Sequence, residues 1–307
     1  MKTWILLVLL ATASGCARHD AIVVGSKNFS EQVILGEMIA QQIERTTNLK
    51  VQRKLNLGGS FICHNAITAG EIDVYPEYTG TALTAILKDA PANDPRQVYL
   101  RVQVAYRALQ LQWMEPFGFN NTFAILIRGE EARRLGIKTI SEAAAHTPKW
   151  KAGFGYEFME RKDGFPGLAS AYGLRFAETP KTMDLSLTYR ALAEKQVDFI
   201  AGNSTDGLIS ALDLFSLQDD LRYFPPYEAA PVVRVEILRQ HPELQAVFHS
   251  LAGKINDDTM RSLNYAVDGK HRDVREVVAE FLGNVSQGTQ NACSRGLGMP
   301  AKLTVPR

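Results

Sequence analysis

The sequence predicts an α/β protein of two lobes, each built on a mostly parallel sheet with helices on both faces. Short apolar segments typical of strands alternate with amphipathic helical segments from residue 21 onward, which is the rhythm of parallel sheets. The same alternation starts again after Ile127, and 307 residues suffice for two domains of ordinary size.

The first residues have the pattern of a signal peptide. Lys2 precedes a short apolar run, and small residues lead from it to Cys16. The run is shorter than the roughly 20 apolar residues that span a bilayer. We predict a signal peptide over residues 1–15 and a lipidated N-terminus and linker over 16–20, with the lipid on Cys16 holding the protein at a membrane surface. The alternative is a simple signal peptide with a chance cysteine, because Ala13 stands where lipoproteins more often carry Leu.

The first lobe is expected over residues 21–126 and 224–307. Its strands are predicted at residues 21–25, 51–55, 72–75 and 230–235, and Gly58-Gly59-Ser60 interrupts the chain after the second of them. A helix opens at Ser30, which is a plausible cap with Glu31 in the first turn. The other predicted helices follow apolar periodicity, one through residues 66–67 and the rest over residues 94–111, 242–255, 258–267 and 272–282.

The second lobe is expected over residues 127–223, inserted into the first. Ser141 is predicted to cap a short helix. A strand is predicted at residues 122–127, where the chain leaves the first lobe, and the pattern then restarts with strands at 151–155 and 197–202 and helices at 167–172 and 187–195. The chain therefore crosses between the lobes twice, near residues 123–128 and 223–230, and both crossings are expected to be hinges.

The composition and the absence of enzyme and metal-binding motifs narrow the possible classes of function. The formal net charge is +1 with no basic tail, which does not favour nucleic-acid binding. The sequence has no G-x-S-x-G elbow, no P-loop and no H-E-x-x-H pair, so no enzyme is predicted. No Cys/His cluster has ligand spacing, so neither a metal nor a cofactor is expected. Cys63 and Cys293 could pair in an oxidising compartment, or remain two separate buried thiols.

Four segments at predicted strand ends or in loops combine a turn former with a cation, a hydroxyl or an aromatic ring. Ligands of open α/β sheets bind at such places. The segments are G-S-K-N-F at 25–29, Y-P-E-Y-T-G-T at 75–81, R-K-D-G at 161–164 and F-P-P-Y-E at 224–228.

These segments resemble one known family. The G-S-K-N-F start, the Gly-Gly before the second helix, the G-E-I-D-V-Y-P-E-Y-T-G-T-A-L block at 70–83 and M-R-S-L-N-Y at 260–265 occur in its order. The chain from about residue 22 to about residue 285 is similar to the substrate-binding proteins of glycine betaine/choline-type osmoprotectant ABC importers. The resemblance implies a two-lobed clamp, outside the cytoplasm, that captures a quaternary-ammonium compound for an ABC permease. We expect a monomer without cofactor, in the periplasm or on the cell surface.

The resemblance also implies which residues touch the ligand. Tyr78 and Tyr227 match ring positions of the family, and Phe123 keeps the ring where a Tyr often stands. Asn203 departs from the pattern, since some relatives have Tyr there. Aromatic faces attract a trimethylammonium group, which cannot donate hydrogen bonds.

The far end of a betaine is a carboxylate, which needs charge-assisted donors. The resemblance assigns Lys27, Thr81 and Arg161 to it. Without the family context, Phe123 would be interpreted as a core residue, and Lys27 and Arg161 as solvated cations. Glycine betaine, choline, carnitine and ergothioneine all fit this chemistry. A same-fold binding protein for another zwitterion or amino-acid derivative is the alternative, with a secreted enzyme or a cytoplasmic effector domain less favoured.

Overall fold

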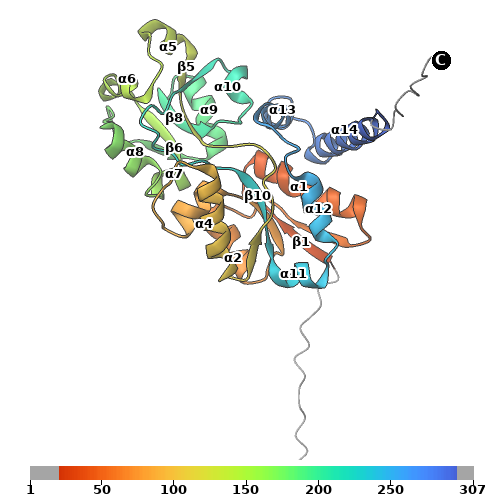
Figure 1. Cartoon of the computed structure of the whole chain (residues 1–307). Helices are drawn as coiled ribbons and strands as arrows, with labels where there is room; N and C mark the ends of the chain where they lie inside the picture. Colours follow the sequence, from red (N-terminus) through yellow and green to blue (C-terminus); the bar gives the residue numbers. More distant parts are fainter. Residues whose placement is uncertain (1–20, 296–307) are drawn as a thin grey trace, which may run out of the picture.

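The computed structural model of the protein describes residues 21–295, with side chains as far as residue 285. It has two lobes, each with one five-stranded sheet between layers of helices (Figure 1). The predicted fold class is therefore confirmed. The predicted signal peptide, the predicted lipid site at Cys16 and the tail beyond residue 295 lie outside the described residues. Within the described part of the chain, no helix is both long and apolar enough to cross a membrane.

The sheet of the first lobe has the order β2-β1-β3-β10-β4. Its strands are β2 (Lys50–Lys54), β1 (Ala21–Gly25), β3 (Val74–Tyr78), β10 (Ala229–Arg234) and β4 (Leu111–Trp113). Strand β1 pairs parallel with β2 and β3, whereas β10 runs antiparallel to β3 and β4. The one reversed strand is the one that enters from the other lobe.

The second lobe repeats this plan in a sheet of order β7-β6-β8-β5-β9. Its strands are β7 (Lys181–Met183), β6 (Ala152–Gly155), β8 (Phe199–Asn203), β5 (Phe123–Arg128) and β9 (Leu214–Leu217). Strand β6 pairs parallel with β7 and β8, and β5 runs antiparallel to β8 and β9. Here too the reversed strand is the first one after a crossing.

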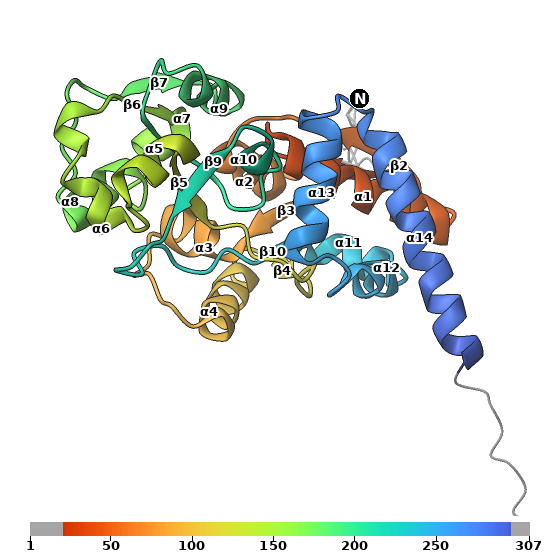
Figure 2. The ribbon, with the colours of Figure 1, turned by 90° about the horizontal axis from the view of Figure 1, so that it is seen from above.

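Helices cover both faces of the two sheets. The first lobe carries α1 (Ser30–Thr46), α2 (Ser60–Thr68), α3 (Thr79–Thr81), α4 (Pro95–Arg107), α11 (Val235–Gln240), α12 (Leu244–Leu251), α13 (Asp257–Asp268) and α14 (Val274–Arg295). A π-helical turn, η1 (Ala82–Ile86), continues α3. The second lobe carries α5 (Gly129–Leu135), α6 (Ile140–Ala144), the 3₁₀ turn η2 (Thr147–Lys149), α7 (Tyr156–Glu160), α8 (Phe165–Tyr172), α9 (Leu185–Ala193) and α10 (Leu208–Ala211). Figure 2 shows α13 and α14 beside α1, which packs against both.

The central strands are apolar on both faces because both faces are covered. Along β1, Ile22 and Val24 face the cluster under α1 and α12–α14, while Val23 faces the cluster under α2 and α4. Successive side chains of a strand point to opposite faces, so a doubly covered strand is a continuous apolar run. Because both faces of these strands are buried, the strands can be recognised in the sequence as short apolar runs.

The two crossings between the lobes run side by side as hydrogen-bonded segments. Asn120 and Glu228 form an antiparallel bridge between them. The Asn121 backbone N–H donates to the Tyr227 carbonyl at 3.0 Å, and the Tyr227 N–H donates to Asn120 Oδ1 at 2.6 Å. The two crossings thus form a short hydrogen-bonded ribbon between the lobes.

Several predicted boundaries differ from the structure. All of β5 pairs in the second sheet, so the first crossing ends before Phe123 and the predicted boundary after residue 126 is too late. The helix predicted over 94–111 ends at Arg107, because Gln110 adopts a left-handed φ of 57° and the chain then enters β4. Ser30 does not cap α1, since its hydroxyl donates to Asp268 and Phe29 holds the cap position.

The cap of α6 is Thr139, and the prediction of Ser141 is wrong. The Thr139 hydroxyl accepts the Glu142 N–H at 3.1 Å, and the Glu142 carboxylate accepts the Thr139 N–H at 3.1 Å. This reciprocal pair is a capping box.

Thr139→Ala should lower the free energy of unfolding by about 1 kcal/mol, because the capping acceptor of α6 is lost. Ser141→Ala is the matched control and should change it less, because the backbone N–H of Ser141 keeps its bond to Asp220 and only the contact of the Ser141 hydroxyl with that exposed carboxylate is lost. Urea unfolding followed by circular dichroism measures both changes. Equal losses in the two variants would contradict the assignment of the cap.

Candidate ligand-binding site

A cavity of about 200 Å³ lies between the lobes. The structure brings all seven predicted ligand-binding residues to its wall: Lys27, Tyr78, Thr81, Phe123, Arg161, Asn203 and Tyr227. Residues that lie 200 positions apart in the sequence thus meet at one place. A concave site between domains is where small ligands commonly bind.

Most of these residues lie at or just after the ends of strands. Lys27 follows β1, and Tyr78 ends β3, with Thr81 in the turn after it. On the other side, Phe123 begins β5 and Asn203 ends β8, directly opposite each other in register. The carboxyl ends of parallel strands are the binding edge of such sheets, so the sheet topology places the site.

Aromatic rings line two sides of the cavity. Phe123 packs edge to face against Tyr227, with ring centroids 5.6 Å apart, and against Phe158 at 4.8 Å. Tyr78 stacks on Phe29 at 6.3 Å. Both tyrosines are buried, with 4% and 2% of their surfaces exposed. These rings hold one another in place before any ligand arrives.

Gly80 allows Tyr227 to reach the cavity. A β-carbon at this position would lie 2.7 Å from the Pro226 carbonyl oxygen and 2.7 Å from Cδ1 of the Tyr227 ring. Both contacts are far inside van der Waals distance, so any larger residue would push the ring aside. The glycine of the Y-T-G-T block therefore has a packing role in the site.

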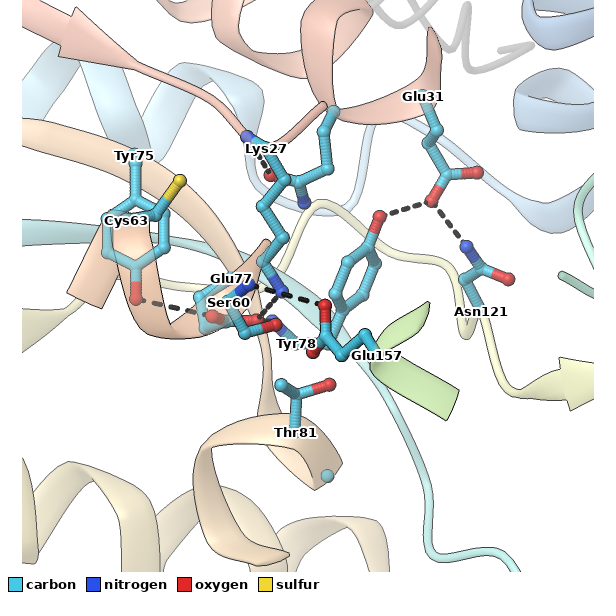
Figure 3. Close-up of polar contacts among 12 residues, drawn as sticks. Lys27, Glu31, Ser60, Cys63, Tyr75, Glu77, Tyr78, Thr81, Asn121 and Glu157 are labelled. Atoms are coloured by element: carbon cyan, nitrogen blue, oxygen red, sulfur yellow. Dashed lines mark hydrogen bonds and ion pairs between the residues drawn. The ribbon is translucent and has the colours of Figure 1, made fainter. Parts of the chain in front are cut away.

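A buried carboxylate fixes the Tyr78 ring. The Tyr78 hydroxyl donates to Glu31 at 2.7 Å, and the Asn121 side-chain amide donates to the same carboxylate at 2.8 Å (Figure 3). Thr205 and Asn264 also donate to Glu31. Burial raises the pKa of Glu31 above its ordinary value, although the four hydrogen bonds act against this shift.

The two predicted cations are already paired with carboxylates of the protein. The Lys27 amine donates to the buried Glu77 carboxylate and lies 5.0 Å from the centroid of the Tyr78 ring (Figure 3). Arg161 Nε donates to Asp163 Oδ1 at 2.9 Å, and its guanidinium lies 5.3 Å from the Phe123 centroid.

Arg161 also links the two lobes. Its Nη1 donates to the Thr81 hydroxyl at 3.3 Å and to Glu157 at 3.2 Å. Glu157 in turn accepts the Ser60 N–H at the start of α2, at 3.3 Å. Burial acts to raise the pKa of Glu157, but Lys27, Arg161 and Ser60 outweigh it and lower this pKa.

The cavity wall and the groups in contact with it contain more carboxylates than cations. Among the described residues that line it, Lys27 and Arg161 are the cations and Glu157 and Asp184 the carboxylates. Glu77 and Asp163 add two more carboxylates in direct contact with those cations. Two cations therefore face four carboxylates, which favours a ligand that brings positive charge.

Sequence reasoning missed several lining residues. Glu157 and Phe158 follow β6 directly, so the rule that ligands bind at strand ends would have found them. Asn121 had no sequence signal. It donates to Glu31, while its side-chain oxygen is buried without a partner among the described residues.

Cys63 does not line the cavity. It is a free, buried thiol in the apolar cluster under α2, and burial raises its pKa to about 12. The possible pairing of Cys63 with Cys293 stays a prediction, because the Cys293 side chain lies outside the described residues. The described residues also contain no group of three or more metal-ligating side chains.

The fold and this interlobe cavity define a solute-binding protein. Residues 20–284 match the family described as the substrate binding domain of ABC-type glycine betaine transport systems, and the chain belongs to this family. The predicted resemblance is thereby confirmed, and the chain is a binding protein, not an enzyme.

Relatives with assigned functions agree with this family assignment. A carnitine transport binding protein of Listeria monocytogenes is 34% identical over 271 residues, covering 87% of this chain and 88% of its own. A glycine-betaine-binding protein of Pseudomonas aeruginosa is 34% identical, covering 88% and 89%. The ergothioneine transport permease/binding protein EgtU of Helicobacter pylori is 35% identical over 90% of this chain, but only 51% of its own length is matched.

A solved structure supports the fold. The crystal structure of a glycine betaine/carnitine/choline ABC transporter component superposes with a TM-score of 0.72 at 36% identity, covering 86% of this chain and 98% of its own. Lactococcal OpuAC, closed on glycine betaine, shares the fold at 11% identity with a TM-score of 0.63.

Asp206, beside the site, should make stability depend on pH. Burial raises its pKa to about 6, above the value of about 3.9 expected in the unfolded chain. The folded state binds more protons between these values, so the free energy of unfolding falls as pH rises through this window. Asp206→Asn keeps an oxygen for the Leu208 N–H and should raise the melting temperature near neutral pH.

Thermal unfolding of wild type and variant at about pH 4 and about pH 7.5 checks this prediction. Most of the gain should be lost at the lower pH, where the folded wild-type carboxyl is protonated and about half of the unfolded-state carboxyls are protonated as well. A gain that is the same at both pH values would mean that the charge of Asp206 is not its cause.

Proposed function

We propose that this protein captures a small quaternary-ammonium compound, such as glycine betaine, choline or carnitine, outside the cytoplasm and delivers it to an ABC permease. The observation that carries the proposal is the set of rings from Tyr78, Phe123 and Tyr227 around one interlobe cavity. The functions of the relatives support the same ligand class.

The cage fits the chemistry of a trimethylammonium group. Its methyl groups offer no hydrogen-bond donor, so it gains from apolar contact and from the negative faces of rings. The excess of carboxylates over cations around the cavity adds a favourable field. Tyr78 is well suited to the role because Glu31 fixes its ring through the hydroxyl.

Lys27, Thr81 and Arg161 line the same cavity as the rings and would receive the polar end of the ligand, in the predicted role of holding a carboxylate. Lys27 lies 5.0 Å from the Tyr78 centroid and Arg161 5.3 Å from the Phe123 centroid, so this group of the ligand would bind close to the rings. A ligand carboxylate has to share Lys27 with Glu77 and Arg161 with Asp163. Choline, which has a hydroxyl in place of a carboxylate, needs no such sharing.

Ligand binding should favour the closed arrangement of the lobes. The cavity wall combines residues of both lobes, so a ligand makes its full set of contacts only when they approach. The permease would recognise this closed form. We further propose that the protein acts as a monomer in the periplasm or on the cell surface, anchored by a lipid on Cys16. A mature N-terminus other than a lipidated Cys16 would contradict the anchor.

A second candidate keeps the fold and changes the ligand. Asn203 stands where some relatives carry a cage Tyr, and its amide offers a donor and an acceptor instead of a ring face. This position favours another small zwitterion or amino-acid derivative as the alternative.

A thermal-shift screen of the mature domain without Cys16 tests the proposal. Glycine betaine, choline, carnitine, ergothioneine and proline betaine are compared with common amino acids. A ligand that binds only the folded state raises the melting temperature. We expect a shift with at least one quaternary ammonium compound, and Tyr78→Ala or Tyr227→Ala should weaken its binding by roughly tenfold or more, because each desolvated ring contributes up to about 2 kcal/mol.

Phe61→Ala is the control for loss of a ring. Phe61 lies on α2 next to the cavity residue Ser60, but its side chain is 44% exposed and does not line the cavity. This variant should bind like wild type. If folded wild type responds to no quaternary ammonium compound, the proposed ligand class is wrong, whereas a response only to an amino acid would support the second candidate.

A further inference from the structure

A carboxylate of the second lobe lies at the start of helix α2 in the first lobe. Glu157, the second residue of α7, accepts the Ser60 backbone N–H at 3.3 Å (Figure 3). Helix α2 has no cap from its own sequence, because Gly59 holds the N-cap position and the first turn contains no acidic side chain. A β-carbon at Gly59 would lie only 2.9 Å from Glu157 Oε2, so the glycine lets the carboxylate approach. The other lobe thus supplies an acceptor for this helix end.

The same carboxylate contacts the cations that are expected to bind the ligand. Its Oε1 accepts Arg161 Nη1 at 3.2 Å. Burial acts to raise the pKa of Glu157, but the charges of Lys27 and Arg161 help to lower it, so the group is ionised at neutral pH. These residues all line the ring-lined cavity, together with Ser60. One carboxylate of the protein therefore takes the contacts that a ligand carboxylate would use, which are a helix N–H and two cations.

Glu157 is held more loosely than the other carboxylates that pair with these cations. Glu77 is fully buried and binds a lysine amine, a tyrosine hydroxyl and a backbone N–H. Asp163 binds a guanidinium and two hydroxyls. The Glu157 side chain is 33% exposed. If it swings away, Lys27 keeps Glu77 and Arg161 keeps Asp163, so no buried cation is left without a partner.

We propose that Glu157 is a built-in competitor of the ligand's anionic end: it occupies the position beside the start of α2, Lys27 and Arg161, and a ligand carboxylate binds there only by displacing it. A ligand without an anionic group leaves Glu157 in place and gains from its charge. Glu157 is then a specificity-determining residue that acts against zwitterionic ligands relative to purely cationic ones. The inference rests on the proposed quaternary-ammonium function and deepens it.

Isothermal titration with a matched pair of ligands tests the competition. Glycine betaine and choline share the trimethylammonium group and differ in the carboxylate or hydroxyl at the other end. Glu157→Gln removes the charge and nearly keeps the shape of the side chain. This variant should bind glycine betaine roughly tenfold more tightly than wild type, because the charged competitor is gone. It should bind choline no more tightly than wild type, because only an attraction for the cation has been removed.

Glu160→Gln is the matched control for the change in net charge. It removes the same charge from the same helix, but the Glu160 side chain is exposed and does not line the cavity. This variant should bind both ligands like wild type. The melting temperature of each variant verifies that it folds.

Crystal structures of the two wild-type complexes give a readout that needs no variant. In the glycine betaine complex, the ligand carboxylate should accept the Ser60 N–H, and the Glu157 side chain should have moved away from α2. In the choline complex, Glu157 should still accept the Ser60 N–H.

Failure of this inference can be told apart from failure of the proposed function. If folded Glu157→Gln leaves the ratio of the two affinities unchanged, or if Glu157 stays on the Ser60 N–H in the glycine betaine complex, Glu157 is no competitor, while the quaternary-ammonium function stands. An equal shift in Glu160→Gln, or binding of neither ligand by a protein that binds another quaternary ammonium compound, overturns the inference as well. If wild type binds no quaternary ammonium compound of the screen, the proposed function has failed, and this inference fails with it.

Discussion

The buried carboxylate of Glu31 is the constraint on which the site depends. Burying a charge is costly unless hydrogen bonds replace its lost water, and Glu31 receives four donors. Each donor comes from a different part of the chain: Tyr78 from the end of β3, Asn121 from the first crossing, Thr205 from the loop after β8 and Asn264 from α13. One side chain of α1 therefore fixes a cage ring, a crossing and the contact between the lobes, and a shift in any of these would leave the carboxylate short of a donor.

The crossings contribute to recognition as well as to connection. Phe123 is the first residue of the strand that follows one crossing, and Tyr227 lies in the other, two residues before β10. Their rings pack against each other, and the two crossings are hydrogen-bonded together. Phe123 is fixed in β5 of the second lobe, so this ring contact joins that lobe to the crossing that carries Tyr227. Tyr78, Arg161 and Asn203 lie on the lobes themselves, so opening changes their distances and exposes the cage.

Local patterns in the sequence predicted what depends on local structure. Most of the strands, the turn after Tyr78 and the site at the strand ends follow from local patterns and turn residues, and the family motifs added Phe123 and Tyr227, whereas the short strands β4, β7 and β9 were not predicted. The pairings could not be predicted in this way. Glu31 precedes its partner Asn264 by more than 200 residues, and Lys27 meets Glu77 only because β1 and β3 are neighbours. The strand β4 was missed because a left-handed residue, Gln110, ends the preceding helix without a Gly or Pro to mark it.

The ion pairs that Lys27 and Arg161 form within the protein affect which ligands the cavity selects. Lys27 and Arg161, interpreted from the sequence as binders of a ligand carboxylate, already hold Glu77 and Asp163. A ligand carboxylate gains only what exceeds those existing pairs, whereas a ligand cation gains from the rings and from every carboxylate nearby. The positive end therefore dominates recognition, and the rest of the ligand is selected by the space and the donors that it finds. Asn203 lines this cavity and a second, larger one, and it supplies an amide where the family resemblance implies a ring, so this position is expected to affect the strength of the cage.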